Sequence, residues 1–138
     1  MPIHFFAEDI VFKPLHPRKT SLWIKRAIEK EAHNLDTLNY IFCSDAYLLE
    51  MNQEYLSHKT YTDIITFDNS DEEKLINGDI FISIERVREN AEKFDTTFEQ
   101  ELHRVMIHGV LHLMGYKDKT PEEKSTMRKK EEAYLSLR

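Results

Sequence analysis

The sequence predicts a mixed fold in which helices pack against a small β-sheet. Patterns typical of strands and of helices alternate along the chain. Its 138 residues, 41% of them hydrophobic, are enough for one core without cross-links. With only three glycines and four prolines, and no repeat, low-complexity tract or linker, we expect residues 1–138 to form a single domain.

The N-terminal segment is expected to form a strand and then a helix. Residues 3–12 are rich in apolar side chains and are predicted as a strand, which a loop through Pro17 follows. Thr20 or Ser21 then suits the cap of a helix that runs to about His33, because these side chains accept hydrogen bonds from free backbone amides.

A second strand and helix follow. Residues 38–43 are predicted as a strand, in which Cys43 is expected to be a buried small hydrophobic residue. Ser44 or Asp45 is the expected cap of a helix that runs to about Tyr55.

The central region predicts a hairpin and two helices. Residues 62–67 are short and β-branched, and residues 78–84 are apolar, so both are predicted as strands. The polar, acidic residues 69–77 are the loop between them. Residues 85–93 and 97–114 are expected to be helical.

The last predicted helix begins at Thr120. Pro121 suits the first helical turn, and Glu123 lies three residues after Thr120, which is the spacing of a capping box.

A histidine pair in the helix over residues 97–114 carries the strongest chemical signal. His108 and His112 are four residues apart, so they lie on one face of a helix and can bind the same metal ion. Gly115 suits the left-handed residue that ends such a helix, and the chain can then return with Asp118 as an oxygen ligand. Three protein ligands leave one position for water, as in a catalytic zinc site. A pair of ordinary core histidines is the alternative.

The surroundings of the pair favour the metal. Most side chains around it are apolar, so the helix is expected to be buried, and buried imidazoles need partners for their ring nitrogens. The apolar residues are Phe98, Leu102, Val105, Met106, Val110, Leu111 and Leu113.

Residues 108–118 resemble the signature HGxLHLxGYDH of the YbeY family, metal-dependent endoribonucleases of single-stranded RNA that act in ribosomal RNA maturation and ribosome quality control. Residues 52–67 and 78–83 also resemble the family. The resemblance implies an α+β domain with a four-stranded mixed sheet, about five helices and the metal-binding helix in the core. It also implies that His108, His112 and Asp118 are the catalytic metal ligands.

The chain departs from the family pattern at three positions. Asp118 stands where the family has a histidine. A single zinc ion is still the expected metal, but the oxygen donor shifts the preference toward harder ions, so manganese is an alternative. Leu56 replaces an arginine thought to handle phosphate, and nearby His58 or Lys59 could supply the positive charge. Tyr61 replaces a proline.

The net charge of −6 is unusual for a nuclease, because phosphate is bound largely by Lys and Arg. Lys117 and Lys119, beside Asp118, are the basic residues most expected to contact RNA. The expected partners are single-stranded, ribosomal RNA and ribosomal particles or their associated proteins, and not DNA.

Three features of the sequence bear on cellular location. The chain has one cysteine, no N-terminal pattern of a signal peptide, and no apolar run long enough to span a membrane. We therefore expect a cytoplasmic protein without a membrane partner.

The residues leave the mechanism open. Gly109 occupies the position of the glutamate base in HExxH peptidases, which argues against that class. Asp63, Glu101 or the metal's own water could accept the proton, or the RNA 2′-hydroxyl could attack directly. Asp63 is expected either to line the cleft or to cap a turn. His103 lies about 140° around the helix from His108 and is expected to take no part in the site.

Two other functions remain open. The same ligands would serve a metallohydrolase of a different substrate, and a non-catalytic ribosome-associated factor could use them for a structural metal.

Overall fold

The computed structural model describes residues 2–56 and 62–138. Its elements, in chain order, are β1 (Ile3–Ala7), α1 (Pro17–Lys30), β2 (Asn34–Cys43), α2 (Asp45–Leu56), β3 (Ile64–Asp68), β4 (Leu75–Ser83), α3 (Ile84–Lys93), α4 (Phe98–Leu113) and α5 (Pro121–Leu135). His58, Lys59 and Tyr61 lie outside the described residues.

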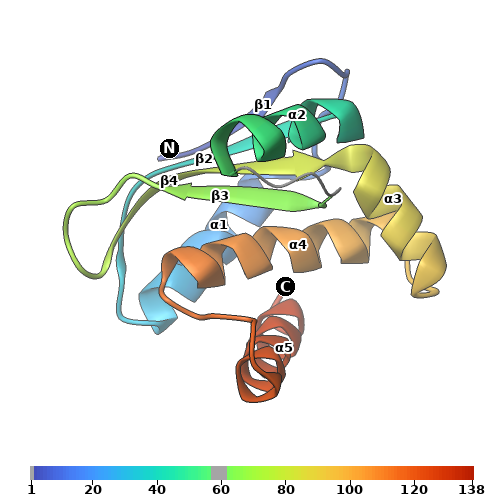
Figure 1. Ribbon diagram of the computed structural model, residues 1–138. Coiled ribbons are helices and arrows are strands. Elements are labelled where there is room, and N and C mark those ends of the chain that lie inside the picture. Colours follow the sequence, from blue (N-terminus) through green and yellow to red (C-terminus); the bar gives the residue numbers. More distant parts are fainter. Residues whose placement is uncertain (1, 57–61) are drawn as a thin grey trace.

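The four strands form one mixed sheet in the order β1-β2-β4-β3 (Figure 1). β2 pairs in parallel with both β1 and β4, whereas β3 pairs antiparallel with β4 through the hairpin that the sequence predicts. The expected α+β fold, with a four-stranded mixed sheet and five helices in the described chain, is confirmed.

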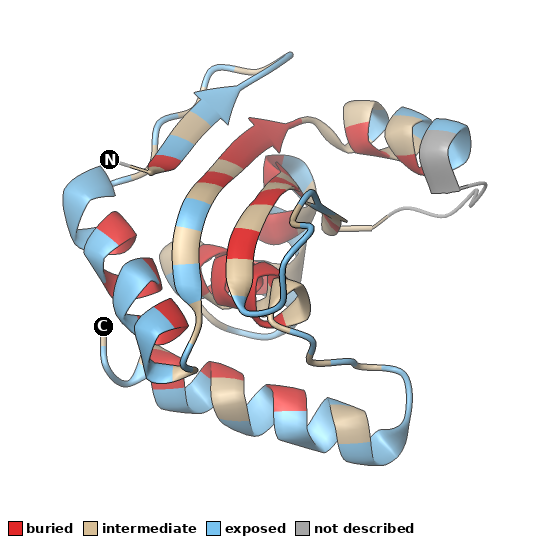
Figure 2. Cartoon of the chain, turned by 90° about the vertical axis from the view of Figure 1, so that its left-hand side faces the viewer, coloured by how far each residue is buried: buried red, intermediate tan, exposed pale blue. Residues whose placement is uncertain are grey.

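Helices cover both faces of the sheet. α2 lies on one face, while α1 and α4 lie on the other with α5 beyond them (Figure 1). The larger hydrophobic cluster fills the side of α1 and α4, and a smaller one around Cys43, Leu48 and Ile65 lies under α2. In Figure 2 the buried residues lie on the sides of the helices that face the interior of the protein, while the outer sides are exposed.

α4 lies directly against the sheet because of a glycine. A Cβ added at Gly109 would come within 2.9 Å of Ile64 Cδ1 and 3.0 Å of Ile80 Cδ1. A larger residue would require the Ile64 and Ile80 side chains to shift, so the glycine allows close packing on the sheet. Most residues of α4 around it are buried, and the metal-motif helix belongs to the core, as expected.

The structure corrects two boundaries near the N-terminus. The first strand ends at Ala7 rather than at residue 12. The following helix begins at Pro17, not at Thr20 or Ser21, which are both buried inside it. The fixed φ of proline suits the first helical position, so Pro17 starts the helix that we expected it to precede.

Other local predictions are confirmed. Ser44 Oγ accepts a hydrogen bond from the Tyr47 amide (3.1 Å) at the start of α2, and Cys43 is buried in β2. Thr120 and Glu123 form the predicted capping box at the start of α5. Within the described residues, no helix is long and apolar enough to cross a membrane.

Candidate metal centre

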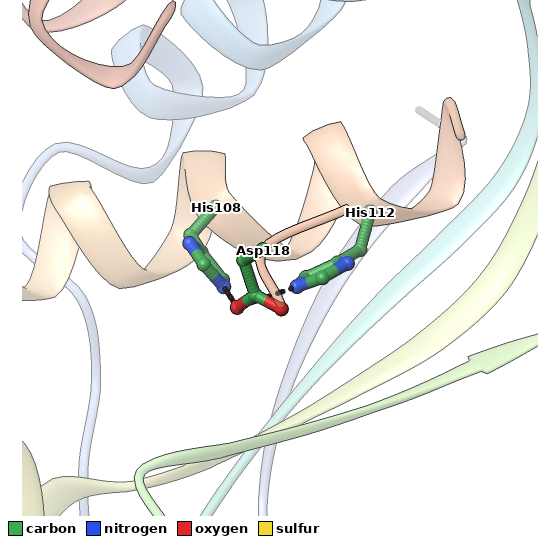
Figure 3. A group of neighbouring side chains, drawn as sticks. All are labelled: His108, His112 and Asp118. Carbon is green, nitrogen blue, oxygen red and sulfur yellow. Dashed lines mark hydrogen bonds and ion pairs between the residues drawn. The ribbon is translucent and has the colours of Figure 1, made fainter. Parts of the chain in front are cut away.

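His108, His112 and Asp118 converge at the end of α4 (Figure 3). Asp118 Oδ2 lies 3.3 Å from Nε2 of His108 and 3.3 Å from Nε2 of His112. Donor atoms about 2.0–2.1 Å from a tetrahedral zinc ion lie about 3.3–3.4 Å from one another. All three donor atoms lie within 4.8 Å of one another, and two imidazole nitrogens with a carboxylate oxygen fit a divalent transition metal.

The turn after α4 brings Asp118 back to the helix. Gly115 has φ +100°, the left-handed conformation that its position predicts. Its amide donates to His112 O, and the Tyr116 amide donates to Leu111 O, both at 3.0 Å. These bonds reverse the chain within three residues of the ligand position.

A polar cluster around Glu31 holds this returning segment in place. Tyr116 donates a hydrogen bond to Glu31 Oε1 (2.5 Å), and Tyr134 and Lys130 of α5 bind the other carboxylate oxygen. Burial alone would raise the pKa of Glu31, but these three partners lower it below its usual value. Glu31 therefore ties the end of α1 to α5 and to the Asp118 loop.

Glu131 of α5 is a site residue that we did not predict from the sequence. Its Oε2 lies 2.7 Å from His108 Nδ1, and its Oε1 accepts from Arg104 (3.1 Å). It lies on the buried stripe of α5 with Met127 and Tyr134. A glutamate at the buried position of an otherwise apolar i, i+4, i+7 pattern is the sequence signal that could have indicated it.

Glu131 selects the form of the His108 ring that can bind a metal. An ionised carboxylate only accepts hydrogen bonds, so Nδ1 carries a proton toward Glu131, and Nε2 is the nitrogen that can coordinate a metal when the ring is neutral. Burial alone would lower the pKa of His108, but Glu131, with Asp118 and Asp63, raises it. Such a carboxylate partner orients a ligand histidine and makes it more basic.

The centre opens into a cleft of about 1100 Å³ between α4, α5 and the start of β3. Asp63 and Glu101 lie on its walls, as does Arg104, which binds Glu131 and Glu132. Burial raises the pKa of Asp63, which His108 partly offsets. Burial and the charge of Asp63 also raise the pKa of Glu101.

The remaining predicted residues have separate places. Lys117 and Lys119 flank Asp118 and are exposed, but they are not among the described side chains that line the cleft. His103 is buried and its ring packs edge-on against Trp23 of α1, at 5.7 Å between centroids. Leu56 ends α2.

Comparisons with known proteins agree with these features. A family model described as "Endoribonuclease YbeY" matches residues 10–137. A protein named Endoribonuclease YbeY from Cytophaga hutchinsonii is 54% identical over 99% of this chain and 95% of its own, and one from Bacteroides thetaiotaomicron is 43% identical over the full length of both. A solution structure of a Thermotoga maritima protein matches with TM-score 0.67 and 29% identity, over 97% of this chain and 87% of that one.

Proposed function

Because this chain belongs to the Endoribonuclease YbeY family, we propose that His108, His112 and Asp118 hold the catalytic divalent metal of an RNA-cleaving site. The chain is an endoribonuclease, a hydrolase of RNA phosphodiester bonds. The observation that supports these three residues most is that Asp118 Oδ2 lies 3.3 Å from Nε2 of each histidine, a spacing that suits ligands of one tetrahedral ion.

The proposed metal is one zinc ion per chain. The two imidazoles favour zinc, whereas the carboxylate of Asp118 makes a harder ion such as manganese more acceptable than three imidazoles would. When bound, the metal supplies a Lewis acid that makes a coordinated water more acidic and stabilises charge on a phosphoryl oxygen.

The protein's own groups orient and surround this centre. Glu131 keeps Nε2 of His108 free for coordination, and the bonds of Tyr116 to Glu31 hold the loop that carries Asp118. Asp63 and Glu101, on the cleft walls, are the carboxylates available to take a proton near the reacting phosphate. The volume of the cleft is large enough for more than one nucleotide.

We propose single-stranded ribosomal RNA as the substrate and the cytoplasm as the location, with the chain acting as one domain on ribosomal particles or their associated proteins. The net charge of −6 supports dependence on a partner, because the protein offers RNA little long-range attraction. Lys117 and Lys119 are exposed beside Asp118 and can contact phosphates at the edge of the site. His58 and Lys59 are further proposed phosphate contacts, which lie outside the described residues.

The first experiment measures metal content by elemental analysis on tag-free protein, with wild type beside His112→Ala. We expect about one zinc or other transition metal per wild-type chain, because three protein ligands are enough to retain one ion. The variant should lose this metal. Cleavage of single-stranded ribosomal RNA should then require the metal and disappear in His112→Ala.

Other outcomes would contradict the proposal. No metal in wild type, even after incubation with zinc or manganese, would reduce the pair to core histidines and favour a non-catalytic ribosome factor. Metal-dependent turnover of small esters or amides without RNA cleavage would instead indicate a metallohydrolase of another substrate.

A further inference from the structure

Glu101 of α4 is a buried carboxylate that the three-donor centre does not use. It lies two helical turns before His108, on the same face of α4, and only 5% of the residue is exposed. Within residues 2–56 and 62–138, no group donates a hydrogen bond to its carboxylate or forms an ion pair with it. An ionised carboxylate on so buried a residue is costly unless it gains a positive partner from the cleft.

The side chains around Glu101 add to this requirement. Asp63 lines the same cleft, and its charge raises the pKa of Glu101, which means that the two carboxylates repel one another. Arg104, the closest cation on α4, directs its two guanidinium nitrogens at Glu131 (3.1 Å) and Glu132 (2.7 Å). Arg128 likewise lies 4.0 Å from Glu131.

We propose that Asp63 and Glu101 form a second cation site, separate from the three-donor centre, for a hard divalent ion such as Mg²⁺ or Mn²⁺. Two carboxylates, with water in the remaining positions, are a common way for proteins to hold Mg²⁺ near a phosphate. The two proposed ligands, Asp63 and Glu101, supply only oxygen donors, which favours a hard ion over zinc.

This site would also explain how an acidic cleft receives RNA. Asp63, Glu101, Asp118, Glu131 and Glu132 all line it, and together they repel a phosphate. A divalent ion between Asp63 and Glu101 neutralises the charge of these two carboxylates and offers an open position to a phosphate oxygen of the RNA next to the cleaved bond. Only this last role depends on the proposed nuclease function, since cation binding itself does not.

The test measures Mn²⁺ binding to protein whose three-donor centre is already saturated with zinc, by electron paramagnetic resonance of free Mn²⁺. Wild type should bind one Mn²⁺ in addition to zinc. Glu101→Gln, which keeps the shape of the side chain, should weaken this binding about tenfold or more, because it removes one of two charges next to the ion. Asp63→Asn should weaken it to a similar extent.

Glu99→Gln is the matched control, because Glu99 also lies in the first turn of α4 but does not line the cleft. It should bind Mn²⁺ as wild type does. All variants should keep their zinc and should unfold at or above the wild-type temperature, because the two cleft variants remove a repelled carboxylate. Zinc-loaded wild type that binds no Mn²⁺ at millimolar concentration, or equal binding by wild type and both cleft variants, would overturn the proposal. Zinc content and RNA cleavage, measured in parallel, report separately on the three-donor centre.

Discussion

His103 and His108 lie five residues apart on α4, yet their surroundings differ in every respect that matters for chemistry. His103 packs against Trp23, and burial, with the charges of Arg138 and Lys19, lowers its pKa to about 4. His108 meets Glu131 and Asp118, which raise its pKa despite burial. The same residue type on the same helix is therefore a neutral packing group on one side and a carboxylate-bound ligand candidate on the other.

The sharpest separation of the two histidines is in metal binding. His108→Ala should abolish metal retention and RNA cleavage, because it leaves two donors for an ion that needs three protein ligands. His103→Ala should keep its metal but lose about 2–4 kcal/mol of stability through the cavity it leaves against Trp23. Elemental analysis and chemical denaturation of both variants measure these effects. Full cleavage activity in His108→Ala would end the assignment of the site.

The third donor can be changed without altering the helix. Asp118→Ala should weaken metal binding, whereas Asp118→His should preserve or tighten zinc binding and reduce the acceptance of manganese, because imidazole is the softer donor. Competition with a chromogenic chelator gives the affinities for both metals. Identical affinities in wild type and both variants would show that Asp118 is not a ligand.

The carboxylate partner of His108 should have a smaller effect. Glu131→Gln should reduce metal affinity by about 10–100-fold, because Nδ1 of His108 loses the acceptor that fixes its tautomer. Glu132→Gln is the control, since Glu132 binds the same Arg104 but not His108. If chelator competition finds both variants equal to wild type, Glu131 serves only the packing of α5 on α4.

Protonation of His103 should have the smallest effect on metal binding, but it should change the stability of the fold. Its pKa is about 4 in the folded chain against 6.5 for an ordinary histidine, so between these values the unfolded chain binds the extra proton. The contribution of His103 to stability is thus complete above pH 6.5 and is lost as the pH falls toward 4, by about 3 kcal/mol.

Denaturant unfolding at several pH values would measure this loss. His103→Phe should flatten the fall in stability between pH 6.5 and 4, whereas His4→Phe, at an exposed position, should not. An unchanged slope in His103→Phe would show that acid unfolding starts elsewhere, and metal content at neutral pH should be the same in all three proteins.

Much of the fold was predictable because local patterns and tertiary packing agree. The alternation of strands and helices, the cap at Ser44 and the capping box of Thr120 and Glu123 all follow from short stretches of sequence, and the structure confirms them. The predicted start of α1 was wrong, because Thr20 and Ser21, which suit a cap, are buried inside a helix that already begins at Pro17. Burial there depends on contacts across the core and not on neighbours in the chain.

The sequence by itself determined that His108 and His112 share a face of one helix, since four residues make about one turn, and that Gly115 can end that helix. Tertiary structure alone decided what that face meets. Asp118 comes within 3.3 Å of both rings. Glu131, 23 residues after His108, and Glu101, in the same cleft as Asp63, acquire their surroundings from the packing of α5 and the sheet on α4. Helix periodicity is a local property of the backbone, whereas the partners of a side chain depend on how separate elements pack, which no single stretch of sequence encodes.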